Sequence, residues 1–99
     1  MINTMIKTFK HKGLRLFFTT GNKVKINASH ASKLNVQLQA LHTAEMVEDM
    51  NIPGWGFHEL KGSRQNVYSI TVNGNWRLTF EFNDGNAFVL NYEDYPNDY

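Results

Sequence analysis

An arginine in the second half of the chain has the position expected of an anion-binding side chain. Arg77 stands between Trp76 and Leu78 in a segment where apolar and polar residues alternate. Successive residues of a strand point to opposite faces, so the guanidinium is expected on the polar face of a sheet, where an anion can reach it. The alternative is a surface arginine paired with Glu81 or Glu59, as solvated charges often are.

Two more basic groups precede the first strand of that predicted sheet. His58 and Lys61 lie in the segment Phe-His-Glu-Leu-Lys-Gly at 57–62, and the chain can bring both toward Arg77. Histidine changes protonation near neutral pH, which suits general acid–base catalysis. The other histidines are scattered over the predicted helical half and are interpreted as structural: His11, His30 and His42.

The C-terminal segment 91–99 is both acidic and aromatic. A ring at Tyr92 or Tyr95 offers a surface on which an unstacked base can lie, and a carboxylate at Glu93 or Asp94 offers a proton acceptor or an orienting group. The alternative is a frayed polar tail, and composition alone favours it.

Several kinds of site have no support in the sequence. The chain has no cysteine, and its histidines lack the close spacing of a zinc site. A calcium loop, a nucleophile elbow, a phosphate-binding loop and a dinucleotide fingerprint are also absent. We therefore expect chemistry without a metal or a cofactor.

The elements that must position these residues follow from hydrophobic periodicity in a chain of 99 residues, 41% of them hydrophobic, which predicts one domain over 1–99. A short strand is expected at 5–9 and a helix at 12–20, ended by Gly21 and Asn22. A longer helix starts after a cap at Asn27 or Ser29. Its core stripe consists of Ala31, Leu34, Leu38 and Leu41, with Met46 and Met50 as a possible continuation up to Pro53.

Beyond Pro53 the apolar period changes from 3.6 to 2. Strands are predicted at 66–72, 76–82 and 87–93, with a type I′ hairpin turn at Asn73-Gly74 and a second turn at 83–86. The fold class is therefore α+β, with two N-terminal helices packed on the apolar face of a small antiparallel sheet.

Charge is divided unevenly along the chain. Residues 1–44 hold seven Lys or Arg and no acidic residue, whereas residues 45–99 hold three basic and nine acidic residues. The basic half either contacts a polyanion or forms a solvated helix face. Apolar runs fall far short of the ~20 residues that cross a bilayer, and the N-terminus lacks signal-peptide features. We expect a cytoplasmic protein without a membrane partner.

Five segments in one order resemble the HigB-type toxins, the plasmid-maintenance "killer protein" branch of the RelE superfamily of toxin–antitoxin systems. They are MIKTFKHKGL at 5–14, FHELKG at 57–62, YSITV at 68–72, NWRLTF at 75–80 and NYEDY at 91–95. The resemblance covers nearly the whole chain and implies a compact microbial RNase fold, with two helices on an antiparallel sheet.

The resemblance also implies a ribosome-dependent endoribonuclease that cleaves messenger RNA in the ribosomal A site. A HigA-type antitoxin with a helix-turn-helix domain would neutralise it, and operator DNA would be bound only through that complex. Matching motif positions give the site residues His58, Lys61, Arg77, Asp94 and Tyr95. Many relatives follow the Asp-Tyr pair with a histidine, where this chain has Pro96.

RNA can be cleaved without a metal when its own 2′-hydroxyl attacks the adjacent phosphate. In that reaction Arg77 and Lys61 would stabilise the phosphate, His58 or Asp94 would take the proton, and Tyr95 would orient or stack on the nucleotide. The basic segment Lys7–Lys33 would contact ribosomal RNA. Two alternatives are ribosome-independent RNase activity and a catalytically weak or inactive RNA- or protein-binding module of the same fold.

Overall fold

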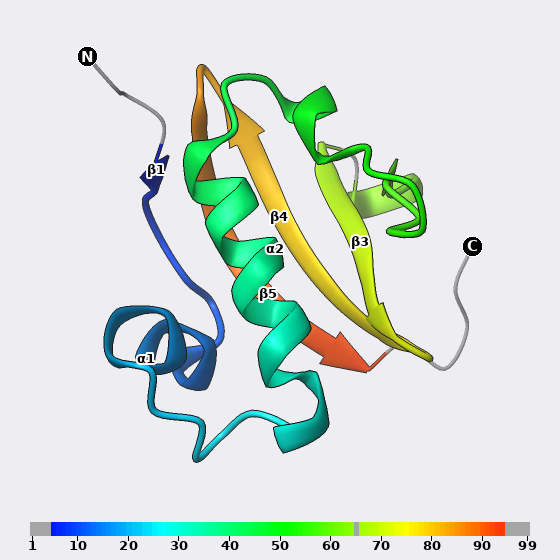
Figure 1. The fold of residues 1–99 in the computed structure, drawn as a ribbon. Coiled ribbons are helices and arrows are strands. Elements are labelled where there is room, and N and C mark those ends of the chain that lie inside the picture. The colour runs from blue at the N-terminus through cyan, green and yellow to red at the C-terminus, as the bar shows by residue number, and fades with distance from the viewer. Residues whose placement is uncertain (1–4, 65, 95–99) are drawn as a thin grey trace.

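One mixed β-sheet and two α-helices form the fold in the computed structural model, which describes residues 5–64 and 66–94 (Figure 1). The sheet has five strands in the order β1-β5-β4-β3-β2. Their bounds are β1 Met5–Ile6, β2 His58–Glu59, β3 Val67–Asn73, β4 Trp76–Asn83 and β5 Asn86–Asp94. The predicted α+β class is confirmed, and the three predicted strands of the second half are present.

The expectation of a wholly antiparallel sheet is wrong at one edge. β1 runs parallel to β5, with Met5 opposite Asn86 and Ile6 opposite Ala87. Beyond β1 the N-terminal segment continues along β5, where the Lys7 amide donates to the Ala87 carbonyl at 2.7 Å. An uncovered strand edge exposes unpaired backbone groups, and this segment covers the edge that the meander leaves open.

The first helix, α1 (Lys12–Thr20), has the predicted bounds because both of its ends are capped. At its start the Leu14 amide donates to His11 Nδ1 at 2.9 Å. At its end Gly21 adopts a φ of +81°, and its amide donates to the Phe17 carbonyl. A left-handed residue after the last turn is the usual helix stop, and glycine adopts that conformation without strain.

The second helix, α2 (Ala31–Thr43), lies across one face of the sheet (Figure 1). Asn27 caps the short 3₁₀ turn η1 (Ala28–His30) that leads into it, as its Oδ1 accepts from the Ser29 amide. The predicted stripe is buried in one core with residues of the central strands: Leu34, Leu38 and Leu41 with Ile70, Leu78 and Phe80.

The prediction that this helix continues through Met46 and Met50 is wrong. Ala44 is extended, and a separate 3₁₀ turn, η2 (Val47–Met50), follows. The Asp49 carboxylate accepts from the Glu45 amide at 2.9 Å, which holds the start of this turn out of the helix. Met50 is fully buried, whereas Met46 is 56% exposed.

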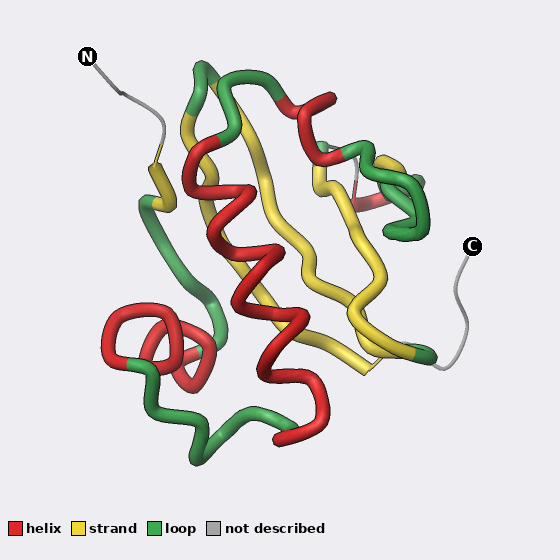
Figure 2. Tube along the Cα trace, in the orientation of Figure 1, coloured by secondary structure: helices red, strands yellow, loops and turns green. Residues whose placement is uncertain are grey.

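The prediction that both helices pack on the sheet is not confirmed in that form. α1 is short and lies beside the β1–β5 side of the molecule, whereas α2 crosses the sheet (Figure 2). Leu14 and Phe17 of α1 still contribute to the common core. The face of the sheet opposite α2 carries the polar residues of the strands.

The three histidines interpreted as structural have structural partners. His11 caps α1, and His42 Nδ1 accepts from the Ile6 amide at 3.3 Å. His30 is 3% exposed, and its Nδ1 lies 2.6 Å from the Tyr92 hydroxyl. The contacts of His42 and His30 join the helical half to the strands.

Shortening a core side chain tests the packing between α2 and the sheet. Phe80 is fully buried in the common core and packs against Tyr68 with ring centroids 6.0 Å apart. We expect Phe80→Ala to lower the free energy of unfolding by about 3–5 kcal/mol, because it removes buried apolar surface and leaves a cavity. Urea denaturation measures this, and Val36→Ala at a 56% exposed site should change stability by under about 0.5 kcal/mol.

Candidate active site

Two rows of side chains cross the polar face of the sheet. Residues directly opposite one another on antiparallel strands share a face. The first row runs from β2 to β5 and contains His58, Ser69, Thr79 and Asn91. The second row lies beside it and contains Thr71, Arg77 and Glu93. The sheet thus places His58 and Arg77 on the same face, in adjacent rows.

The ring of His58 has a defined orientation. Its Nδ1 lies 2.9 Å from the Gly56 carbonyl oxygen. A carbonyl only accepts hydrogen bonds, so Nδ1 carries the hydrogen and Nε2 carries the lone pair of the neutral ring. The Thr71 amide in turn donates to the Trp55 carbonyl at 2.7 Å, which ties the loop before His58 to β3. His58 therefore has the tautomer of a general base that uses Nε2.

Gly56 is required for this arrangement. Its φ is +59°, and a Cβ atom there would lie 3.0 Å from Thr71 Oγ1. We expect Gly56→Ala to lower the free energy of unfolding by about 1–2 kcal/mol, the cost of a left-handed residue with a side chain. It should also displace the His58 ring, because the carbonyl that orients it must move. Chemical denaturation and the His58 ring resonances in an NMR spectrum test both effects, and wild-type values in both would contradict this account.

Arg77 lies on the polar face but is more enclosed than predicted. The residue is 6% exposed, although the alternation alone predicted an open guanidinium. Its Nη1 donates to the Gly74 carbonyl at 2.6 Å and to the Trp76 carbonyl at 3.1 Å. Gly74 lies in the short turn between β3 and β4 and Trp76 begins β4, so the two carbonyls hold the guanidinium near this end of the sheet.

A bulge in β5 determines which carboxylate shares the face of Arg77. Near the second turn Glu81 pairs with Phe88, but Thr79 pairs with Asn91, so β5 contains one extra residue. Val89 lies in that gap with a φ of +54°. An extra residue reverses the alternation beyond it. Glu93, and not its neighbour in the chain, therefore lies opposite Arg77.

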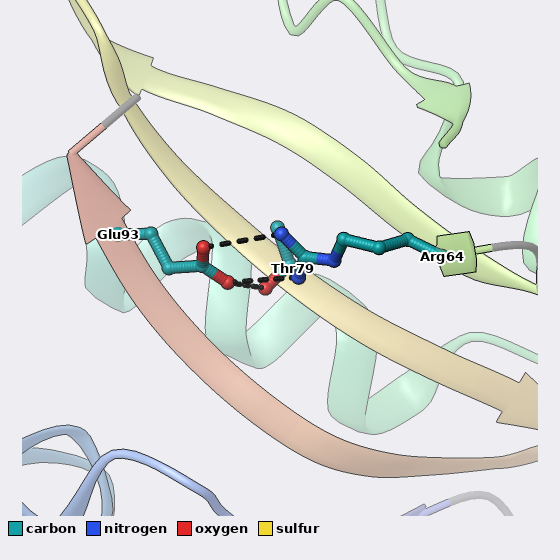
Figure 3. Close-up of polar contacts among 3 residues, drawn as sticks. All are labelled: Arg64, Thr79 and Glu93. Atoms are coloured by element: carbon teal, nitrogen blue, oxygen red, sulfur yellow. Dashed lines mark hydrogen bonds and ion pairs between the residues drawn. The ribbon is translucent and has the colours of Figure 1, made fainter. Parts of the chain in front are cut away.

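Glu93 forms a polar cluster with Arg64 and Thr79 that sequence reasoning did not find as a unit (Figure 3). Arg64 Nη1 and Nη2 donate to the two carboxylate oxygens at 3.3 and 3.1 Å, and the Thr79 hydroxyl donates at 2.8 Å. Burial would raise the pKa of Glu93. Hydrogen bonds from Thr79, Arg64 and Asn91, with the charge of Arg64, instead hold that pKa below its usual value. Glu93 is thus ionised at neutral pH.

A shallow hollow of about 230 Å³ lies beside this cluster. Arg64 is the last residue of the 3₁₀ turn η3 (Gly62–Arg64), and no periodic pattern marked it in the sequence. The hollow is lined by Lys10, Ser63, Arg64, Val67, Thr79, Glu81, Val89, Asn91 and Glu93. Its walls carry two basic and two acidic side chains, which suits a polar ligand more than a purely anionic one.

The remaining predicted site residues are Lys61, Asp94 and Tyr95. Lys61 is exposed and borders a separate hollow with Glu59. Asp94 is exposed and pairs with Trp76, so the alternation places it on the face opposite Glu93. Tyr95 and the neighbouring Pro96 lie outside the described residues. The strand register therefore places His58 and Arg77 on one face of the sheet and Asp94 on the other.

Within residues 5–64 and 66–94, no three His, Asp or Glu side chains lie close enough together to hold a metal ion. In the same ranges, no helix has the length and apolar character needed to cross a bilayer.

Comparison with known proteins identifies the family. Residues 7–96 match the model of the HigB-like toxins, described as the RelE-like toxin of the type II toxin–antitoxin system HigB. The chain belongs to this family. This chain is also 47% identical over 91 residues to endoribonuclease HigB of Proteus vulgaris. The match covers 92% of this chain and 99% of that relative. The family membership predicted from the five segments is confirmed.

Proposed function

We propose that this HigB-like toxin stops translation by cutting messenger RNA in the ribosomal A site. The family match makes it a toxin of a type II toxin–antitoxin system, and its near full-length similarity to an endoribonuclease gives it that activity. The observation that carries the proposed site is the shared polar face, on which His58 and Arg77 lie in adjacent rows. That arrangement supports a base and a phosphate-binding cation acting on one substrate.

In the proposed reaction the 2′-hydroxyl of the RNA is the nucleophile. His58 Nε2 takes its proton while the 2′-oxygen bonds to phosphorus, the bond to the 5′-oxygen breaks, and that oxygen takes up a proton. The products are a 2′,3′-cyclic phosphate and a free 5′-hydroxyl. Arg77 and Lys61 stabilise the charge that develops on the phosphate. Asp94 is the alternative base, and Tyr95 is proposed to stack on the displaced nucleotide.

The proposed partners are the translating ribosome in the cytoplasm and a HigA-type antitoxin with a helix-turn-helix domain, through which the complex would bind operator DNA. A toxin of a type II system has an antitoxin partner, which the family match supports. The basic half of the chain supports the contact with ribosomal RNA. All seven of its basic residues are exposed: Lys7, Lys10, Lys12, Arg15, Lys23, Lys25 and Lys33.

Charge reversal in this basic half tests the ribosome contact. Lys23→Glu combined with Lys25→Glu should weaken ribosome binding, and the loss should be larger at low salt, because counterion release and weaker screening favour phosphate contacts there. Sedimentation with ribosomes at two salt concentrations measures this. A binding constant that does not respond to salt would exclude the proposed contact.

The function itself is tested by expressing the toxin in a bacterium that lacks the antitoxin and mapping 5′ ends on a defined transcript by primer extension. Growth arrest with new ends inside translated codons, and no cut in naked RNA, supports the proposal. Equal cleavage of naked RNA would show a ribosome-independent RNase. Intact messages with abundant folded protein would show a catalytically weak or inactive binding module.

A further inference from the structure

We propose that Glu93 is a positioning residue of the RNA-cleaving site: its carboxylate holds Arg64, and thereby the segment that carries His58 and Lys61, against the central strands. The inference rests on the site proposed above and adds a residue to it. Glu93 does not contact the RNA in this account and acts through the arginine that it binds.

The first observation is the geometry of the contact. Two nitrogens of the Arg64 guanidinium donate to two different oxygens of Glu93, at 3.3 and 3.1 Å. A paired arrangement of this kind fixes orientation as well as distance, because the planar fork of the guanidinium matches the carboxylate. Arg64 lies three residues after Lys61 and six after His58, so its position also restrains theirs.

The second observation is that the carboxylate is anchored at its own end. Thr79 is 1% exposed and donates its hydroxyl to Glu93 Oε2 at 2.8 Å. The Glu93 side chain is 18% exposed, whereas that of Arg64 is 41% exposed. The fixed end of the contact therefore lies on β4 and β5, and Arg64 reaches across the polar face toward it (Figure 3).

The third observation is that the restrained segment has little regular structure. β2 consists of two residues at the edge of the sheet, and η3 of three. Two hydrogen bonds link this segment to the residues that follow it. The Leu60 amide donates to the Val67 carbonyl, and the Asn66 amide donates to Glu59 Oε2. Short edge segments with few backbone bonds open easily, so a side-chain tie has a large effect on their position.

The β5 bulge supports the same conclusion. Glu93 faces Arg64 only because the extra residue at Val89 reverses the alternation in β5. Val89 has a β-branched side chain at a φ of +54°, which is unfavourable, and the Thr8 hydroxyl accepts from its amide at 2.8 Å. Bulges beside functional sites commonly redirect a side chain. Here the bulge directs the carboxylate onto the polar face.

The test compares cleavage of a defined transcript in a cell-free translation reaction by wild type, Glu93→Gln, Arg64→Gln and the double variant. Each single variant should lower the maximal rate about 10- to 100-fold, since a shift of about 1 Å in a catalytic group has an effect of that order. The half-saturating concentration should change little. The double variant should be no slower than the slower single variant, because the two residues act as one unit.

Two further comparisons separate positioning from direct catalysis and from folding. In a His58→Gln background, Glu93→Gln should have a much smaller further effect, because no imidazole remains to be misplaced and only Lys61 can still be displaced. Arg64→Lys keeps the charge and should retain part of the rate. Glu48→Gln removes an exposed carboxylate far along the chain and should match wild type in rate and thermal midpoint.

Several results would overturn the inference. Single variants within about threefold of wild type would do so, as would losses that multiply in the double variant or that persist in full in the His58→Gln background. A rate loss that follows the unfolded fraction in thermal denaturation would assign the pair to folding alone. A wild-type protein that cuts no RNA would overturn the proposed function and this inference with it, whereas the other results overturn only the inference.

Discussion

Arg77→Ala is expected to lower the rate of RNA cleavage by about 10²- to 10³-fold. A preorganised donor aimed at a developing negative charge contributes about 3–4 kcal/mol to transition-state stabilisation. Arg77 fits this role because the carbonyls of Gly74 in the turn and Trp76 at the start of β4 fix its Nη1, so the guanidinium does not reorganise when the phosphate arrives. The measurement is primer extension on a translated transcript, with toxin concentration held equal between variants.

The same contacts require a control for folding. Removing the guanidinium leaves the Gly74 and Trp76 carbonyls without its hydrogen bonds, and the loss of a hydrogen bond typically costs about 0.5–1.5 kcal/mol. The thermal midpoint must therefore be measured with the rate. Arg77→Lys keeps the charge but not the planar fork, and it should fall between alanine and wild type in rate. A folded alanine variant that cleaves at the wild-type rate would remove Arg77 from the site.

Local signals in the sequence were sufficient to predict the elements whose ends are set by their own caps. The bounds of α1 follow from His11 and Gly21, which are adjacent to the helix they limit. The hairpin was predicted one residue early. Asn73 pairs with Trp76, so the loop is Gly74-Asn75, and only Gly74 has a positive φ. The predicted type I′ turn, which needs two such residues, is therefore wrong.

Features that depend on distant partners left no local signal. β1 is two residues long, and its pairing with β5 joins segments at opposite ends of the chain. The tie between Arg64 and Glu93 joins an irregular turn to a strand. In the structure Ala87, Leu90 and Tyr92 are buried, and the spacing of three between the first two departs from strict alternation. That spacing marks the bulge.

The choice of Asp94 over the adjacent Glu93 followed from the family resemblance and not from the strand pattern. The family resemblance implies a role for Asp94, whereas the strand register places Glu93 opposite Arg77. The pKa of Glu93 is held below its usual value, which makes its carboxylate a weak base. On the polar face, His58 is therefore the group that we propose as the base.

His58→Gln is expected to lower the cleavage rate by about 10²- to 10⁴-fold, the usual contribution of a general base. The Gly56 carbonyl accepts from Nδ1, so Nε2 is the nitrogen that takes the 2′-proton. His58→Asn is the matched variant, because its amide can still donate to Gly56 while no basic nitrogen remains. Both variants should retain the wild-type thermal midpoint to within a few degrees and lose the activity.

Asp94→Asn is the decisive comparison for this assignment. Asp94 is exposed and lies on the face opposite Arg77, so its replacement should have a smaller effect than that of His58. Added imidazole should restore part of the rate to His58→Ala and none to Asp94→Asn, because only the first variant lacks a ring of that shape and basicity. A His58 variant with full activity beside an inactive Asp94→Asn would transfer the proton-accepting role to Asp94. If both retain full activity, the proton must be taken by a group outside this pair, and the chemistry assigned to the polar face would have to be abandoned.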